Sequence, residues 1–450
     1  MFGGGPTRNM VSAAKGLPED WDVQTGRNVR WSTPLGSQTY GGPLAVGDQV
    51  YVGTNHQGRR DPRIEGDRGV ILAFRSQDGE LLWQAVHDKL PSPANDWPQQ
   101  GICSTPAVEG DRLYYVSNRA ELVAADTQGF RDGENDGPWR EEPRSEATDA
   151  DLVWKLDMIA ELSVFPHNLA AGSPLVVGDL VYVATGNGVD EDHSTLPAPD
   201  APSLLAVDKR NGRVVWSDRS PGRRVLHGQW SNPAYGVIRG RAQVVFGAGD
   251  GWLYSFEPEH GTLFWKLDAN PKDAVYQPGF GATRNPIVAT PVIEGDLVYV
   301  GVGDDPELGD GIGHLYAVDG SSLGDVTGSA VVWHRGGEDF RRTLSTVAVF
   351  GGLVFAADLS GLLYCLDARS GALLWSYDTL AAVWGSPLVA DGKVYLGDED
   401  GDVAVLDAGP VKRLIREINM RASVYTTPAA VDGLLFVASR NRLFAIAGPK

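Results

Sequence analysis

One pattern of short apolar runs recurs along this chain and limits what it can fold into. Residues 343–378 contain four such runs, at 347–350, 353–358, 362–367 and 373–378. Pairs that contain glycine, such as Gly351-Gly352, separate the runs. Runs of β-branched and aromatic residues joined by two-residue glycine turns are typical of consecutive antiparallel strands. The stretch therefore predicts a four-stranded sheet, which needs neighbours to cover both of its faces.

The same pattern appears eight times. The units begin near residues 40, 103, 171, 230, 288, 344, 384 and 425. In seven of them the innermost strand opens on a proline, namely Pro43, Pro106, Pro174, Pro233, Pro291, Pro387 and Pro428, whereas the sixth unit has Val347 at that place. A repeat of roughly 40–50 residues with four strands is the signature of a β-propeller. We therefore expect an all-β chain in which residues 1–450 form a single eight-bladed propeller.

A tryptophan marks the fourth strand of most units, and its position predicts how the ring closes. The eighth unit ends at residues 444–446 without a fourth strand, whereas residues 21–31 contain the turn and the tryptophan but no first three strands. We expect residues 21–31 to complete the last blade, which would remove the exposed edges of an open array. Residues 1–20 show no pattern, and we expect them to run along the surface.

Charge and composition exclude several classes of function. The net charge is −19, which argues against nucleic-acid binding and against binding to anionic membranes. No apolar run approaches the ~20 residues of a membrane span, and the first residues lack the basic and apolar regions of a signal peptide. The two cysteines, Cys103 and Cys365, lie in distant units, so we expect no disulfide. We expect a monomer.

The repeat also resembles a known family. The segments AVDKRNGRVVW (206–216) and CLDARSGALLW (365–375) are similar to the pyrroloquinoline-quinone (PQQ) repeat. That repeat occurs in eight-bladed quinoprotein dehydrogenases and in assembly-factor lipoproteins of bacterial outer membranes. The resemblance covers about residues 21–447. It implies the propeller fold and a periplasmic or otherwise exported protein, whereas the motif itself serves blade packing and does not settle function.

The resemblance leaves two functions open. Enzymes of the family bind PQQ and calcium at one mouth of the central channel, but this chain has neither their adjacent cysteines nor a match to their catalytic aspartate motif. We therefore assign no catalytic residue. The first interpretation is a non-catalytic exported propeller that binds a protein or a small anionic ligand at its loop-rich mouth. The alternative is a PQQ-dependent alcohol or aldose dehydrogenase, or a relative with an altered site.

The residues just before each innermost strand are expected to face the channel mouth. They include four arginines, two histidines and several flat aromatic side chains. Converging guanidinium groups and aromatic rings suit a planar ligand that carries carboxylates. The alternative is that the arginines pair with carboxylates from loops. The predicted ligand-binding residues are His167, His227, Gln229, Trp230, Arg284, Asn285, Arg341, Arg342, Trp384, Arg421 and Tyr425.

Metal binding has weak support from the sequence. Asp304, Asp305, Glu307 and Asp310 could offer oxygen ligands to a hard cation such as calcium, although they lack EF-hand spacing. The remaining histidines, among them His193, are scattered over different units, and no zinc spacing such as H-E-x-x-H is present. The sequence therefore predicts no zinc site.

Overall fold

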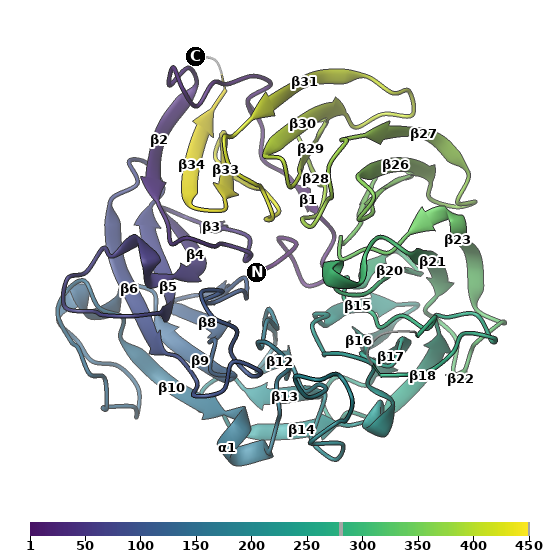
Figure 1. Ribbon diagram of the computed structural model, residues 1–450, viewed down its shortest axis with the longest axis horizontal. Coiled ribbons are helices and arrows are strands. Elements are labelled where there is room, and N and C mark those ends of the chain that lie inside the picture. Colours follow the sequence, from purple (N-terminus) through teal and green to yellow (C-terminus); the bar gives the residue numbers. More distant parts are fainter. Residues whose placement is uncertain (279–281, 449–450) are drawn as a thin grey trace.

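The computed structural model describes residues 1–278 and 282–448. The described residues form eight antiparallel sheets arranged radially around a central channel (Figure 1). Among them no helix is long and apolar enough to cross a membrane. The predicted eight-bladed, all-β propeller is confirmed.

Each blade has four strands, numbered from the channel outward. Blade one contains β3 (Leu44–Val46), β4 (Gln49–Asn55), β5 (Arg68–Arg75) and β6 (Leu81–Asp88), and blade two contains β7 (Ala107–Glu109), β8 (Arg112–Val116), β9 (Glu121–Asp126) and β10 (Leu152–Asp157). Blade three contains β11 (Leu175–Val177), β12 (Leu180–Ala184), β13 (Leu204–Asp208) and β14 (Val214–Asp218), and blade four contains β15 (Ala234–Ile238), β16 (Arg241–Gly247), β17 (Trp252–Phe256) and β18 (Leu263–Asp268).

The second half of the ring follows the same order. Blade five contains β19 (Val292–Glu294), β20 (Leu297–Val302), β21 (Ile312–Asp319) and β23 (Val331–Arg341), and blade six contains β24 (Ala348–Phe350), β25 (Leu353–Ala357), β26 (Leu362–Asp367) and β27 (Leu373–Asp378). Blade seven contains β28 (Leu388–Ala390), β29 (Lys393–Gly397), β30 (Asp402–Asp407) and β31 (Leu414–Asn419). The described helices are α1 (Met158–Leu162) and four 3₁₀ turns, at His56–Gly58, Gly129–Asp132, Gly222–Arg224 and Pro306–Leu308.

The last blade is closed by both ends of the chain. It contains β32 (Ala429–Val431), β33 (Leu434–Ser439) and β34 (Arg442–Ala447), and its outer strand is β2 (Val29–Pro34). β2 pairs antiparallel with β34, with Trp31 opposite Ala445. Figure 1 shows this pair where the first and last parts of the chain meet. The predicted closure by the N-terminal strand is confirmed.

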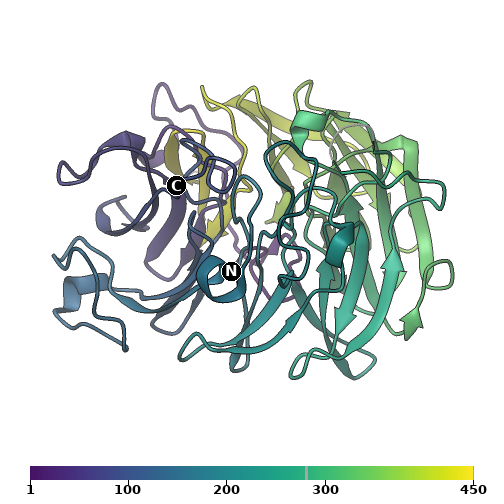
Figure 2. The same cartoon turned by 60° about the horizontal axis from the view of Figure 1, so that its bottom comes forward.

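The expectation that residues 1–20 run along the surface is wrong for the first twelve. This segment lies at the ring's centre (Figure 2), where β1 (Val11–Ser12) pairs parallel with inner strand β28. Arg8 is fully buried, and its guanidinium donates hydrogen bonds to the carbonyls of Pro233, Ser173 and Phe2 at 2.8–3.0 Å. The segment therefore fills one end of the channel with the chain's own residues.

The tryptophan and the turn glycine of the repeat meet across blade boundaries. Trp333 of blade five packs on Gly371 of blade six, where an added Cβ would lie 2.6 Å from the indole ring. Gly371 also has a φ of +70°, which favours glycine. The Trp333 indole donates to the carbonyl of Ala368 at 3.0 Å. The repeat motif thus works as a lock between neighbouring blades.

The polar residue before each inner-strand proline forms a belt around the channel. The backbone N–H of Thr105 donates to the hydroxyl of Ser173, and that of Ser173 donates to the side-chain oxygen of Asn232. The same relation continues around the ring and links each blade to the next. Members of the belt are Thr105, Ser173, Asn232, Thr290, Thr346, Ser386 and Thr427.

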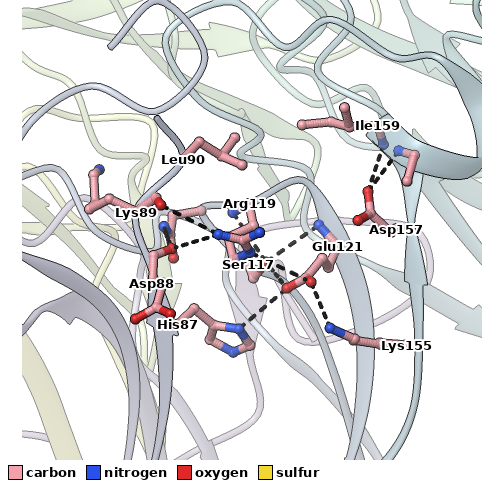
Figure 3. A network of polar contacts seen from close by, with 12 residues as sticks. His87, Asp88, Lys89, Leu90, Ser117, Arg119, Glu121, Lys155, Asp157 and Ile159 are labelled. Atoms are coloured by element: carbon pink, nitrogen blue, oxygen red, sulfur yellow. Dashed lines mark hydrogen bonds and ion pairs between the residues drawn. The ribbon is translucent and has the colours of Figure 1, made fainter. Parts of the chain in front are cut away.

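A buried carboxylate joins blades one and two (Figure 3). Glu121 on β9 is 2 % exposed, and it accepts hydrogen bonds from Ser117 and Lys155, each at 3.0 Å. His87 on β6 lies 3.4 Å away and Arg119 lies 3.7 Å away. Burial raises the pKa of Glu121, but His87 and Lys155 outweigh burial and lower this pKa to about 2. The chain therefore supplies every partner that this carboxylate needs.

Candidate functional site at the channel mouth

The open end of the channel contains a pocket of about 380 Å³. Loops that precede the inner strands build its wall, and loop residues 97–100 and 305–307 add to it. Sequence position therefore placed several of these side chains well. The pocket is lined by Gln38, Tyr40, Trp97, Pro98, Gln99, Gln100, Cys103, Asn168, Leu169, Ala171, Trp230, Val288, Asp305, Pro306, Glu307, Leu344 and Trp384. Below it, a smaller hollow continues down to Phe2 of the N-terminal segment.

Aromatic rings form two sides of this mouth. Tyr40, Trp384 and Tyr425 make one cluster, with ring centroids 4.9–6.0 Å apart. Trp230 faces them from blade four, and its indole donates to the carbonyl of Leu169 at 3.3 Å. Trp97 comes from the loop between blades one and two and is 43 % exposed. Such walls offer flat apolar surfaces and electron-rich ring faces to a ligand.

Three buried polar atoms of the pocket residues lack a hydrogen-bond partner within the described part of the chain. They are Gln38 Oε1, Gln100 Oε1 and Trp384 Nε1. An unpaired buried polar atom costs about 1–3 kcal/mol, so a site that leaves several unpaired suits a bound molecule or water. Nearby, Gln99 and Asn168 have φ values of +64° and +58°, a strained backbone that occurs often at functional sites.

Two carboxylates reach the pocket from the loop between β20 and β21. Asp305 and Glu307 both line it, and no lysine or arginine does so among the described residues. Burial raises the pKa of Asp305, while the Glu307 N–H, which donates to it at 2.9 Å, lowers this pKa. The pocket is therefore acidic, whereas the sequence predicted a ring without carboxylates.

The arginines of the predicted ring bind other parts of the chain and do not line the pocket. Arg284 makes a two-point ion pair with Asp268, and its Nε donates to the carbonyl of Asp250 at 2.9 Å. Arg342 donates to Asn285 and to the carbonyl of Leu308, both at 2.7 Å. Because Leu308 follows Asp305 and Glu307 in the same loop, Arg342 holds that loop in place.

The other predicted residues also have defined positions. Arg421 is exposed and donates to Gln24 at 2.9 Å, and the Arg341 backbone N–H donates to Asp358 at 3.1 Å. Gln229 is buried, donating to Ser203 and accepting from the Gly249 N–H. Of the eleven predicted residues, Trp230 and Trp384 line the mouth pocket, and Tyr425 lines the hollow below it. The rest support the loops around them or belong to the histidine cluster.

Three histidines converge beside Trp230. His167 and His227 are buried and were predicted at the mouth, whereas His193 comes from the loop between β12 and β13. The Nε2 atoms of His167 and His193 lie 3.0 and 2.9 Å from Nε2 of His227. Burial, followed by the neighbouring His227, lowers the pKa of His167 to about 3. Sequence reasoning missed this cluster because no local spacing connects its members.

The proposed oxygen ligands form no comparable group. Asp304 is buried and accepts from His227 at 3.0 Å, while Glu307 and Asp310 are exposed. Among the described residues, the groups of three or more potential metal ligands are the histidine cluster and an exposed one of Glu257, Glu259 and His260. Asp304 therefore contributes to the mouth by orienting a histidine.

Comparison with known proteins identifies the family. The family described as outer membrane protein assembly factor BamB matches residues 9–135, 67–305 and 313–447. The chain belongs to this family. A stretch of 133 residues is also 26% identical to the dehydrogenase subunit of the quinone-dependent alcohol dehydrogenase of Gluconacetobacter polyoxogenes, but it spans only 29% of this chain and 15% of that protein.

Solved structures support the fold. BamB from Moraxella catarrhalis is 14% identical with a TM-score of 0.59, over 93% of this chain and 97% of that one. The quinohemoprotein alcohol dehydrogenase ADHIIG from Pseudomonas putida HK5 is 12% identical with a TM-score of 0.65, over 99% of this chain and 79% of that one. At this level of identity the likeness concerns the propeller and leaves the chemistry of the mouth to be read from its own residues.

The mouth residues do not fit PQQ. That cofactor is planar and carries several carboxylates, so its site needs cationic partners. Here the pocket carboxylates are Asp305 and Glu307, and Arg284 and Arg342 are bound elsewhere. Two carboxylates facing an anionic ligand would repel it. The aromatic walls alone would suit a quinone, but the charge of the pocket does not.

Proposed function

We propose that this protein is a non-catalytic, exported propeller that binds a protein partner by accepting a positively charged segment of that partner at the channel mouth. The observation that carries the proposal is the pocket of about 380 Å³ with aromatic walls and two carboxylates, lined by no lysine or arginine among the described residues. This revises the anionic ligand expected from the sequence.

The chemistry of the pocket supports a cationic group. A lysine or arginine side chain held over an aromatic face gains about 0.5–2 kcal/mol, and more when it is desolvated. Asp305 and Glu307 would pair with it, and the unpartnered Gln38 and Gln100 oxygens would accept its hydrogen bonds. The net charge of −19 would also speed the approach of a basic partner. The family description, an assembly factor, is consistent with binding to other proteins.

Labelled peptides test this proposal directly. We would measure the fluorescence anisotropy of three fluorescein-labelled peptides of equal length, one alternating lysine and glycine, one glutamate and glycine, and one serine and glycine. We expect the basic peptide to bind best. The double variant Asp305→Asn/Glu307→Gln should weaken its affinity about 10-fold, which is ~1.4 kcal/mol. The variant Trp384→Ala should weaken it by a similar factor.

A matched control separates the pocket from the overall charge. Glu399→Gln/Asp400→Asn removes the same two charges from the turn between β29 and β30, which does not line the pocket. We expect this control to bind the basic peptide like the wild type. Equal affinity for all three peptides, or equal weakening by the two double variants, would refute the proposal.

A second measurement addresses the oxidoreductase alternative. We would add PQQ and Ca²⁺ to the purified protein, separate it by size exclusion, and record the quinone absorption. We expect no quinone to co-elute with the protein, because the pocket is acidic. A co-eluting quinone together with dye reduction by alcohols or aldoses would favour the enzyme.

A further inference from the structure

The three-histidine cluster at the mouth has a geometry that hydrogen bonding alone does not explain. Nδ1 of His167 lies 2.9 Å from the carbonyl oxygen of Val189. A carbonyl only accepts hydrogen bonds, so Nδ1 carries the proton and Nε2 presents a lone pair. Nδ1 of His227 lies 3.0 Å from the carboxylate of Asp304, which fixes the same tautomer.

The two lone pairs therefore face each other. Nε2 of His167 and Nε2 of His227 are 3.0 Å apart, with no proton between them when both rings are neutral. His193 places its own Nε2 2.9 Å from that of His227, and one proton from His193 could satisfy only one of the two contacts. Both His167 and His227 are buried, so adding a charge to either ring without a counter-ion is costly.

We propose that His167, His193 and His227 bind one divalent transition-metal ion, for which zinc is the best-matched occupant. Imidazole nitrogens are ligands that zinc prefers, and the ligand atoms of the three residues all lie within 4.8 Å of one another. Zn–N bonds of about 2.0–2.1 Å at tetrahedral angles place ligand nitrogens about 3.3–3.4 Å apart. The two contacts need to widen only slightly to admit the ion.

The surroundings of the cluster resemble a supporting shell for a metal. Metal-binding histidines usually donate their second N–H to a carboxylate or a backbone carbonyl, which orients the ring. Asp304 does this for His227, and Val189 does it for His167. The carboxylate also offsets part of the positive charge of the ion. These two partners come from blades five and three, so the site joins loops of different blades.

The loop that carries His193 is built to present it. The Asp190 carboxylate accepts from the Ser194 N–H at 2.7 Å and from the Thr195 hydroxyl at 2.6 Å, which closes a tight turn around His193. His193 itself has a φ of +54°, a strained conformation for a residue with a side chain. It is half-buried, so an ion can reach the cluster from its side.

The site has room for one ligand that the chain does not supply. The group contains three residues, and no fourth histidine, cysteine or carboxylate of the described chain joins it. Three protein ligands with an open fourth position differ from the closed four-ligand arrangement of structural zinc sites. Water or a donor group of a bound partner would take that position, beside Trp230 and the mouth pocket. The metal site does not depend on the cationic ligand proposed for that pocket.

Zinc titration of the chelator-treated protein tests the site. We would dialyse the full chain against EDTA and then titrate Zn²⁺ in competition with a chromogenic chelator. We expect one equivalent to bind. His193→Gln should weaken binding at least about 100-fold, since it removes a ligand, and Asp304→Asn should weaken it about 10–100-fold through the orientation of His227. Because His193 lies in a loop and is half-buried, its variant is the one least able to disturb the fold.

Cobalt and a control histidine complete the test. Co²⁺ bound in place of Zn²⁺ should give the intense visible absorption of four-coordinate cobalt, and His193→Gln should abolish it. His260→Gln removes an exposed histidine from the other candidate group and should leave one equivalent bound. Melting curves without metal would confirm that the variants are folded. If the folded wild type binds no zinc, or if His193→Gln still binds one equivalent with unchanged affinity, the proposal is wrong.

Discussion

Glu121 and Asp305 are both withdrawn from water, yet their surroundings differ in kind. Glu121 lies between blades one and two, where Lys155, His87 and Ser117 surround it and its pKa falls to about 2. Asp305 lies at the channel mouth, where burial raises its pKa and the lining residues of the described chain include no lysine or arginine. The comparison teaches that the chain can satisfy a buried carboxylate fully, so the acidic, partly unpaired mouth is better explained by something that binds there.

The largest expected effect lies at the satisfied carboxylate. Glu121→Gln should lower the free energy of unfolding at pH 7 by about 3 kcal/mol, because a pKa lowered from 4.5 to about 2 represents that much stabilisation. The folded-state pKa is depressed, so this stabilisation is present above pH 4.5 and is lost as the pH falls toward 2. Urea unfolding at pH 7 and pH 3 should therefore show a difference from wild type that shrinks in acid. Glu134→Gln, at an exposed loop position, should show no such difference.

An intermediate effect is expected at Arg284, a mouth residue whose partners are internal. Arg284→Gln should destabilise the protein by about 1–3 kcal/mol, because Asp268 and the Asp250 carbonyl lose a charged donor. Urea unfolding would measure this loss. The affinity of the glutamate–glycine peptide should not change, since Arg284 does not line the pocket. A clear loss of acidic-peptide binding would restore the arginine ring that the sequence suggested.

The smallest effect on stability is expected at Asp305, with the opposite sign. A raised pKa means that this carboxylate opposes folding as the pH rises above its unfolded value of 3.8. Asp305→Asn should therefore be slightly more stable than wild type at pH 7, by up to about 1 kcal/mol, and the gain should disappear near pH 3. Thermal unfolding at the two pH values would measure it. A variant less stable than wild type at pH 7 would contradict the view that Asp305 lacks a partner.

The fold could be predicted because its determinants are local and repeated. The inner-strand proline, the turn glycine and the tryptophan recur at a fixed spacing, and the structure uses each of them in one way. Trp333 locks onto Gly371, and Thr105 donates to Ser173, through contacts between neighbouring blades that every unit can copy. The closing strand was predictable for the same reason, since residues 21–31 carry the part of the repeat that the last unit lacks.

The site was only partly predictable because its partners lie far apart in the chain. Position before an inner strand correctly placed Trp230 and Trp384 at the mouth, since strand direction fixes where those residues lie. It could not show that Arg284 pairs with Asp268 in the preceding strand β18. His193 lies in an insertion outside the repeat, so no spacing rule connects it with His167 and His227. Residues 1–12 have no repeat pattern, and their place inside the channel depends on the finished ring.

The N-terminal segment determines how the propeller exchanges molecules with its surroundings. Since Phe2 lines the floor below the mouth pocket and Arg8 is bonded to inner-strand carbonyls, the axis is a blind well with one entrance. Whatever enters must leave by the same route, past the loops that hold Asp305 and His193. Those loops would therefore govern both how fast a molecule is captured and how long it stays.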